Sequence, residues 1–192
     1  MESNPITSLR ALAAEIGVSD IAALVLDDPR FARWSASSQH YQHHYGTGGL
    51  VQHTLEVALL ALRNRAILWA FHPTKMPTER EVFLAALYHD AGKMEDYTEI
   101  TPSNWAGTDH KRIIHHISKS GIMWSRAVDK FPAYRAIEER VLHAILAHHG
   151  TRDWGSPIAP KSRLAWLLHL CDCLSARCND ADTLDVVKHY GV

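Results

Sequence analysis

The sequence predicts an all-α fold, a globular helical bundle, and three observations support this prediction. Apolar residues recur at the three- and four-residue spacing of a helix along most of the 192-residue chain. Gly and Pro residues interrupt the pattern at intervals typical of turns between helices. No stretch alternates apolar and polar residues over the length of a strand. We therefore expect helices at residues 8–16, 19–26, 50–71, 78–91, 109–129, 133–148, 160–177 and 183–190.

The first part of the chain combines two short helices with a long polar connection. Gly17 separates the two helices, and Pro29 follows the second. Residues 33–49 are rich in Ser, His, Tyr, Gln and Gly, a composition typical of a loop. Helical periodicity resumes at Leu50 and is stopped by Pro73, which predicts the first long helix.

The next helix has a recognisable beginning and end. Thr78 and Glu81 have the spacing of a capping box, and Gly92 is suited to the position just after a helix. Residues 95–108 are polar and contain Pro and Gly, so we expect an irregular connection there. Pro132 separates the two helices that follow this connection.

Composition and charge exclude several classes of protein. With 46% hydrophobic and 21% charged residues, the chain resembles a folded protein rather than a disordered one. Twenty basic and 21 acidic residues give a net charge of −1, so we expect no binding of long duplex nucleic acid. No apolar run reaches the roughly 20 residues of a membrane span, so we expect no membrane partner.

The cysteines and the N-terminal residues predict a cytoplasmic location. All three cysteines fall within residues 171–178, and an odd number so placed is no disulfide framework. A reducing compartment is the simpler interpretation. The first ten residues lack the basic start and apolar core of a secretory signal. The oligomeric state and the contacts of residues 1–39 stay open at this point.

The tryptophans divide by their predicted surroundings. Trp69, Trp124 and Trp166 lie on apolar helical faces, where we expect them to fill the core. Trp105 and Trp154 fall in predicted connections, and there they are also candidates for stacking on a nucleic-acid base.

Histidine is the unusual residue of this chain, with 14 copies. Several of them lie near the ends of predicted helices, and acidic residues accompany them. Imidazole and carboxylate groups together suit a divalent transition metal, and helical bundles build metal centres from ligands on several helices. The alternative is that these histidines are buried, hydrogen-bonded core residues. The residues concerned are His53, His89, Asp90, His116, His148, His149 and Asp172.

Two strings carry a resemblance to a known family. Residues 48–57 read GGLVQHTLEV and residues 87–93 read LYHDAGK, with Asp172 further on. This order of His, His-Asp and Asp resembles the HD superfamily of metal-dependent phosphohydrolases. Further strings are similar to the HD domain of YhaM-type 3′–5′ exoribonucleases, and to HD domains attached to conjugative relaxases. They are IIHHI at 113–117, LHAILAHHG at 142–150, WGSP at 154–157 and LHLCDCLSA at 168–176.

The resemblance covers about residues 40–178 and implies two parts of the chain. Residues 40–192 would form an HD-type helical bundle, and residues 1–39 an N-terminal helical extension. This extension is too short for the OB-fold that precedes the HD domain in the exoribonucleases. We therefore expect a nucleotide or a short oligonucleotide as substrate.

The superfamily motif implies a set of metal ligands. In members with two ions, Asp90 would bridge them. His115 or His110 stays an alternative to His116, and the neighbours His115 and His116 cannot both point inward. The ion could be Mn, Fe, Ni, Co, Zn or Mg, since such donor sets accept several metals. One ion would be held by His53, His89, Asp90 and Asp172, and a second by Asp90, His116, His148 and His149.

The resemblance implies a metal-dependent phosphohydrolase, either a phosphodiesterase or a nucleotide phosphohydrolase. A divalent ion lowers the pKa of bound water to near 7 in favourable cases and so supplies hydroxide for attack on phosphorus. Asp90 and Lys93 are the predicted catalytic residues, Lys93 as a compact cation for the charge that develops on the phosphate. Lys93 could instead be a solvated lysine at a helix end. The predicted substrate contacts are His43, His44, Lys93 and Arg152.

Two other functions are alternatives to the phosphohydrolase. The first is a 3′–5′ exoribonuclease acting on RNA, which would need an extended basic groove. The second is a non-catalytic module that binds a metal or nucleotide for regulation. The complete His, His-Asp and Asp set weighs against the second, because a sensor has no need to retain every ligand of a hydrolytic centre.

Overall fold

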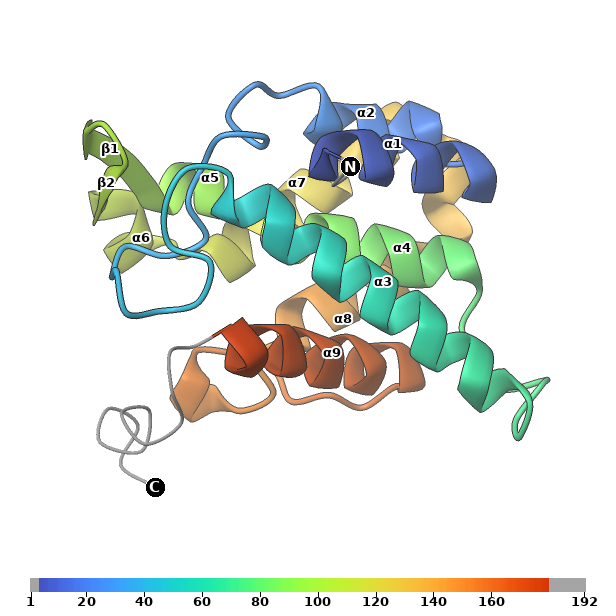
Figure 1. The fold of residues 1–192 in the computed structure, drawn as a ribbon. Helices are drawn as coiled ribbons and strands as arrows, with labels where there is room; N and C mark the ends of the chain where they lie inside the picture. Colours follow the sequence, from blue (N-terminus) through green and yellow to red (C-terminus); the bar gives the residue numbers. More distant parts are fainter. Residues whose placement is uncertain (1–3, 180–192) are drawn as a thin grey trace.

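The all-α prediction is confirmed by the structure, a computed structural model that describes residues 4–179. Helices surround one apolar core, and a two-stranded hairpin stands at the edge of the bundle (Figure 1). The helix expected at 183–190 lies outside the described residues. In chain order, with η for a 3₁₀ helix, the elements are α1 (Pro5–Ile16), α2 (Ser19–Leu26), α3 (Gly49–Trp69), α4 (Glu79–Tyr88), α5 (Lys93–Asp96), β1 (Tyr97–Thr101), β2 (Asn104–Gly107), α6 (Asp109–Ile113), α7 (His116–Lys130), η1 (Pro132–Ile137), α8 (Glu138–Ala147), η2 (Arg152–Trp154) and α9 (Arg163–Asn179).

Helix α4 lies in the middle of the bundle. It packs against α3, α8 and α9, while α1 and α2 cover it from the opposite side (Figure 1). Every residue from 81 to 88 is buried, as expected for a helix with neighbours all round. The chain that leaves α4 therefore delivers the next two residues, His89 and Asp90, into the interior. None of the helices within residues 4–179 combines the length and apolar character of a membrane-spanning segment.

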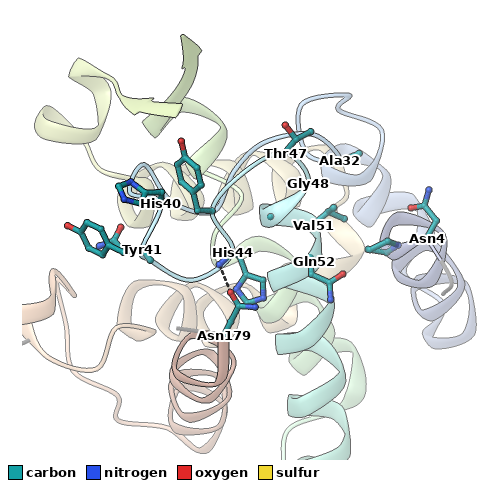
Figure 2. A pocket seen from close by; sticks show the side chains of 14 residues that line it. Asn4, Ala32, His40, Tyr41, His44, Thr47, Gly48, Val51, Gln52 and Asn179 are labelled. Carbon is teal, nitrogen blue, oxygen red and sulfur yellow. Dashed lines mark hydrogen bonds between the residues drawn. The ribbon is translucent and has the colours of Figure 1, made fainter. Parts of the chain in front are cut away.

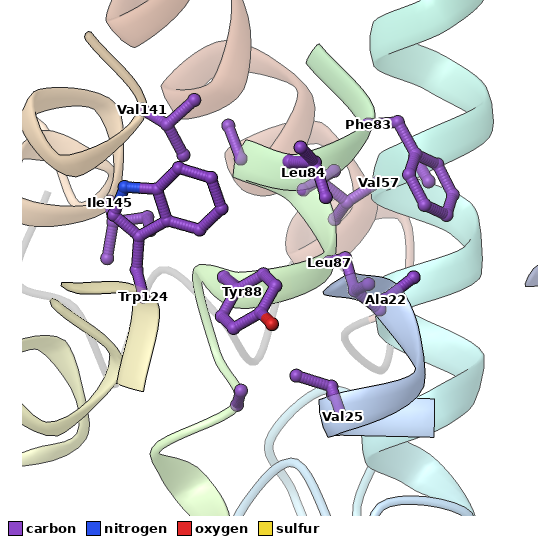
Figure 3. Close-up of a cluster of buried hydrophobic side chains, with 14 of the residues drawn as sticks. Ala22, Val25, Val57, Phe83, Leu84, Leu87, Tyr88, Trp124, Val141 and Ile145 are labelled. Carbon is purple, nitrogen blue, oxygen red and sulfur yellow. The ribbon is translucent and has the colours of Figure 1, made fainter. Parts of the chain in front are cut away.

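The centre of the core is built from large side chains of α4, α7 and α8. Trp124 meets the ring of Tyr88 edge-on, with 5.3 Å between ring centroids, and Ile145 lies beside them (Figure 3). The polar atoms of both aromatic residues are satisfied. The Tyr88 hydroxyl donates to the carbonyl oxygen of Ile21 at 2.8 Å, and Trp124 Nε1 donates to that of Glu138 at 2.9 Å. This packing fixes α4 against its neighbours.

The predicted capping box is confirmed at the start of α4. The Thr78 hydroxyl accepts from the backbone N–H of Glu81, and the Glu81 carboxylate accepts from the backbone N–H of Thr78 at 2.8 Å. The start of α1 is earlier than predicted, because Pro5 occupies a first-turn position that suits proline and Asn4 caps the helix.

The prediction of an irregular connection at 95–108 is wrong. This segment contains the short helix α5 and the antiparallel hairpin of β1 and β2, in which Tyr97 pairs with Gly107. The strands have five and four residues, too short to show a clear alternation of apolar and polar side chains. The hairpin is held by a tertiary contact instead, since Trp105 packs edge-on against Trp34 with 5.1 Å between ring centroids.

The single helix predicted at 109–129 is divided in two. His115 has a φ of 67°, in the left-handed region that a residue with a Cβ seldom adopts, and it separates α6 from α7. As a result, α7 begins at His116, and the backbone N–H of this residue faces inward.

Two of the tryptophan predictions are wrong and one is confirmed. Trp124 is fully buried, but Trp69 and Trp166 are 42% and 51% exposed on α3 and α9. Trp105, for which base stacking was open, is buried in the hairpin contact, whereas Trp154 is 55% exposed.

Candidate metal centre

Asp90 stands between two groups of imidazoles. Its Oδ2 atom lies 3.4 Å from Nε2 of His53 and 3.4 Å from Nε2 of His89. Its Oδ1 atom lies 3.3 Å from Nε2 of His116 and 3.5 Å from Nε2 of His148. The two oxygens of one carboxylate thus face two different sets of nitrogen atoms.

The first group joins α3, the end of α4 and α9. Nε2 of His53 is 3.3 Å from Nε2 of His89, and both nitrogens approach Oδ1 of Asp172, at 3.0 and 3.7 Å. Burial by itself lowers the pKa of His89, but the carboxylates of Asp90 and Asp172 outweigh it and raise this pKa to about 10. The carboxylates therefore attract positive charge to this point.

The second group joins the start of α7 and the end of α8. One donor atom from each of His116, His148 and His149 lies within 4.8 Å of the others. These residues are adjacent in space because α7 and α8 pack together and both present an end to Asp90. Adjacent histidines can converge on one point because they lie at a helix end.

Most of these imidazoles are held by hydrogen bonds at Nδ1. Since a carbonyl oxygen only accepts, a ring that meets one through Nδ1 carries a proton there and turns Nε2 toward the centre, where that nitrogen can bind a metal once it carries no proton. The carbonyl contacts are His89 to Ala86 at 2.7 Å, His148 to Ile145 at 2.6 Å and His149 to Trp154 at 2.6 Å.

Asp96 holds His116 in the same way. Its Oδ2 atom accepts from the backbone N–H of His116 at 2.9 Å and lies 3.0 Å from Nδ1 of the same residue. The other oxygen of Asp96 contacts Nδ1 of His110 at 3.0 Å. Of the three histidines that the sequence left open here, His116 is the one beside Asp90; His110 faces Asp96, and His115 is half-buried.

His53 is oriented by a hydroxyl instead. Its Nδ1 is 3.1 Å from Oγ of Ser175, which donates to Oε2 of Glu56 at 2.8 Å. The same carboxylate contacts Nε2 of His44 at 3.0 Å and accepts from Gln52 at 2.9 Å. Burial raises the pKa of Glu56, but these hydrogen bonds outweigh it and lower the pKa to about 2.

Sequence reasoning gave no role to Glu56 or Ser175, and it placed Asp96 at the pocket mouth or in solvent rather than buried beside His116. Glu56 carries one usable signal, because it follows His53 by three residues on a helix and so shares its face. Ser175 and Asp96 carry none, since their contacts to His53 and His116 span 122 and 20 residues of sequence.

Three polar atoms of the site fit a metal ion. Oδ1 of Asp90 and the Nε2 atoms of His116 and His148 are buried and have no hydrogen-bond partner among the described residues. Leaving such an atom unsatisfied costs about 1–3 kcal/mol. A carboxylate oxygen with imidazole nitrogens is a donor set for a divalent transition metal, which would satisfy all three. The structure thus has clusters of His and Asp able to hold a metal.

A cleft of about 330 Å³ opens over the cluster, and Lys93 lies at its base. Nζ of Lys93 is 2.7 Å from Oδ2 of Asp90. Burial lowers the pKa of Lys93, but Asp90 outweighs it and raises the pKa above the usual value, so the side chain stays charged. His43 also lines the cleft, and burial lowers its pKa to about 2, so this ring stays neutral. Other lining residues are Gln42, His148, His149, Trp154, His169, Asp172, Cys173, Ala176 and Arg177.

Two predicted substrate contacts lie elsewhere. His44 lines a neighbouring cleft of about 660 Å³, where its backbone N–H donates to Oδ1 of Asn179 at 2.7 Å (Figure 2). Its ring is engaged with Glu56. Arg152 is exposed on η2 and does not line the cleft over the cluster.

Comparison with known proteins identifies similar sequences. The HD domain family matches residues 50–177. The chain is 32% identical over 151 residues to the 3′-5′ exoribonuclease YhaM of Bacillus subtilis, a match that covers 76% of this chain and 44% of the relative.

Two further relatives carry the same name. The Oceanobacillus iheyensis protein is 30% identical, with 71% of this chain and 41% of the relative covered. The Listeria welshimeri protein is 30% identical, with 83% and 47% covered. The chain spans less than half the length of these curated relatives. No solved structure matches the chain.

Proposed function

The chain belongs to the HD domain family, and from this premise we propose that it is a metal-dependent phosphohydrolase acting on a nucleotide or a short oligonucleotide. The observation that carries the proposal is the position of Asp90, whose two oxygens face separate groups of buried imidazoles. A carboxylate so placed suits a bridge between two divalent ions.

The proposed ligands follow from this geometry. Divalent ions held there would lower the pKa of a coordinated water and neutralise phosphate oxygens during attack on phosphorus. The sets are His53, His89, Asp90 and Asp172 for one ion, and Asp90, His116, His148 and His149 for the other. The donor types admit Mn, Fe, Ni, Co or Zn, and Mg less readily because of the many nitrogens.

Lys93 and His43 act on the substrate in this proposal. Lys93 is a fixed, buried cation at the base of the cleft, so it stabilises negative charge that builds up on the phosphate. His43 is neutral at physiological pH, so it forms hydrogen bonds to the substrate and does not serve as the acid that protonates the leaving group.

The division at residue 39 is part of the proposal. Helices α1 and α2 precede this boundary and pack on α3 and α4, and their apolar residues belong to the same core. The extension therefore stabilises the helices that present His53 and His89. Free cysteines at 171, 173 and 178 are consistent with a reducing cytoplasm.

Hydrolysis of bis-p-nitrophenyl phosphate tests the proposal. The protein is stripped with chelator and assayed with Mn, Fe, Ni, Co, Zn and Mg in turn, and at least one metal should restore activity. Asp90→Ala should abolish it, and Asp129→Ala, which removes an exposed carboxylate of α7, should not. Absence of hydrolysis with every metal, or full activity of Asp90→Ala, would refute the proposal.

A second candidate, 3′–5′ exoribonuclease, is favoured by similarity to relatives that carry this name. Length-resolved products of end-labelled RNA separate the two, because only an exonuclease yields a ladder of successively shorter products. A panel of mononucleotides and dinucleotides completes the test. Metal binding without hydrolysis of any of these substrates would favour the non-catalytic regulatory module instead.

A further inference from the structure

We propose that single-stranded nucleic acid binds along an exposed aromatic and basic surface that leads from the cleft over the metal centre to a second cleft. This inference rests on the proposed function, because it names the substrate class and the route by which that substrate reaches the centre.

Three aromatic rings connect the two clefts, and we call them the ring track: Trp154, His169 and Trp166. Trp154 and His169 line the cleft over the metal centre, with 6.5 Å between their ring centroids. The His169 ring lies 6.0 Å from that of Trp166. Trp166 lines a cleft of about 590 Å³, here called the second cleft, which is not the one that His44 lines. The ring track is therefore continuous from one cleft to the other.

Two of the rings are exposed, and the third is held by a hydrogen bond. Trp154 and Trp166 are 55% and 51% exposed, an unusual state for the largest apolar side chain. Nδ1 of His169 donates to the carbonyl oxygen of His148 at 2.7 Å, which fixes its ring next to a proposed metal ligand. Exposed aromatic rings in a row suit stacking by successive bases of a strand.

The second cleft is basic, although the chain as a whole is nearly neutral. Its one carboxylate, Glu81, accepts hydrogen bonds from Arg140 and from Thr78. The remaining cations of this basic cleft have no ion pair within the part of the chain that the structure describes, so their charge is available to a ligand. They are Lys75, Lys161 and Arg163.

This combination favours one class of ligand. A mononucleotide at the metal centre would not reach Trp166 or the basic cleft. An acidic peptide would meet the cations but has no bases to stack, and duplex nucleic acid keeps its bases stacked on each other. A single strand supplies both phosphates and free bases along its length. Three rings together with the centre itself accommodate roughly four nucleotides.

Binding of fluorescein-labelled oligonucleotides, followed by fluorescence anisotropy, tests the inference. The probes are oligouridines and oligothymidines of two, four and eight nucleotides, with chelator present to prevent cleavage. Affinity should rise from two to four nucleotides or more. Trp166→Ala should weaken binding of the eight-nucleotide probe about 10-fold. Trp69→Ala is the matched control, because Trp69 is also exposed on a helix but lines neither cleft.

The basic cleft is tested by salt dependence. A single strand loses affinity with salt in proportion to the phosphates neutralised, so Lys161→Ala with Arg163→Ala should lower the slope of log affinity against log salt by about 1.4. The matched control is Arg126→Ala with Lys130→Ala on α7, outside both clefts. Trp166→Leu, which keeps an apolar side chain without an aromatic face, serves if Trp166→Ala unfolds.

The outcomes separate this inference from the proposed function. Unchanged affinity and salt slope in the Trp166 and Lys161/Arg163 variants would overturn the ring track and basic cleft, while hydrolysis of bis-p-nitrophenyl phosphate by the unmodified protein would still support the hydrolase. Weakened binding in these variants supports the strand-binding surface even if that hydrolysis is absent. Equal affinity for two- and eight-nucleotide probes would also overturn the inference.

Discussion

The Ser175 hydroxyl donates a hydrogen bond of 2.8 Å to Glu56. Its single proton is therefore used, and Ser175 can only accept a hydrogen bond from the buried imidazole beside it. The hydroxyl oxygen lies 3.1 Å from Nδ1 of His53 and is left to accept a hydrogen bond from it. Nδ1 of His53 therefore carries the proton, and Nε2 faces Asp90 with a lone pair. Glu56 thus orients a proposed metal ligand that it does not touch.

Ser175→Ala is expected to weaken divalent-metal binding about 10-fold, because partners that fix the tautomer of a ligand histidine contribute on this scale. Isothermal titration with Mn²⁺ or Zn²⁺ measures the affinity, and ¹⁵N chemical shifts of the His53 ring report which nitrogen is protonated. Ser118→Ala on the exposed face of α7 is the control. Unchanged affinity and an unchanged His53 tautomer in Ser175→Ala would contradict the role of the hydroxyl.

Asp96→Ala is expected to affect one ion more than the other. Asp96 holds both the backbone and the ring of His116, which belongs to the second proposed ligand set only. If the native protein takes up two ions per chain, as we propose, this variant should retain about one after desalting. Elemental analysis gives the ratio, and Asp109→Ala, at an exposed carboxylate of α6, should behave as the native protein. Two retained ions in Asp96→Ala would contradict the role of Asp96 in holding His116 as a ligand.

The capping box of α4 gives a prediction on stability and pH. Glu81 is buried, which raises its pKa, but hydrogen bonds from Thr78 and Arg140 outweigh burial and lower the pKa below the usual 4.5. A lowered folded-state pKa stabilises the fold above pH 4.5, and this contribution is lost as the pH falls through the folded pKa. Glu81→Gln should therefore reduce the free energy of unfolding by about 1–2 kcal/mol at pH 7 and by less at acidic pH.

Urea unfolding at pH 7 and pH 3.5 measures this difference. Glu79→Gln is the matched control in the same turn, because Glu79 is exposed and its carboxylate pairs, within residues 4–179, with Arg65 alone. A stability difference between native protein and Glu81→Gln that stays constant with pH would show that charge at Glu81 contributes nothing.

The helices and the cluster of histidines and aspartates could be predicted from the sequence because both depend on local patterns. Apolar periodicity locates α3 and α9, and the Thr78 to Glu81 spacing locates the start of α4. Adjacent histidines followed by glycine indicate helix ends pointing at one site. The side chains of His53, His89 and Asp90 do meet there, with donor atoms within 4.8 Å.

The remaining features depend on contacts that no local pattern encodes. Trp105 is buried because it packs against Trp34, from the connection between α2 and α3, and Trp166 is exposed because no helix covers its face of α9 within the described residues. Ser175 meets His53 only after α9 has packed on α3. The left-handed φ of His115 likewise has no local sequence signal, and the His116 that follows it is held by Asp96 from 20 residues away.

Lys93→Met separates a catalytic role from a structural one. Nζ of Lys93 lies 2.7 Å from the Asp90 oxygen that also faces His53 and His89, so it competes for that oxygen with any cation at the first group. Removing its charge should lower kcat for bis-p-nitrophenyl phosphate about 100-fold, as loss of one preorganised charge-stabilising group does. Metal affinity should stay the same or increase, because the competing cation is gone.

The two readouts must therefore diverge in Lys93→Met: slow turnover with full metal content. Because the pKa of Lys93 is raised above its usual value, the native protein should show no loss of activity from Lys93 deprotonation up to about pH 10. Lys119→Met is the matched control, since Lys119 pairs with Glu95, 3.9 Å away, among the described residues and does not line the cleft. If activity and metal content fell together in Lys93→Met, Lys93 would support the ligands rather than the reaction, because loss of a charge that acts only on phosphate cannot release the ion.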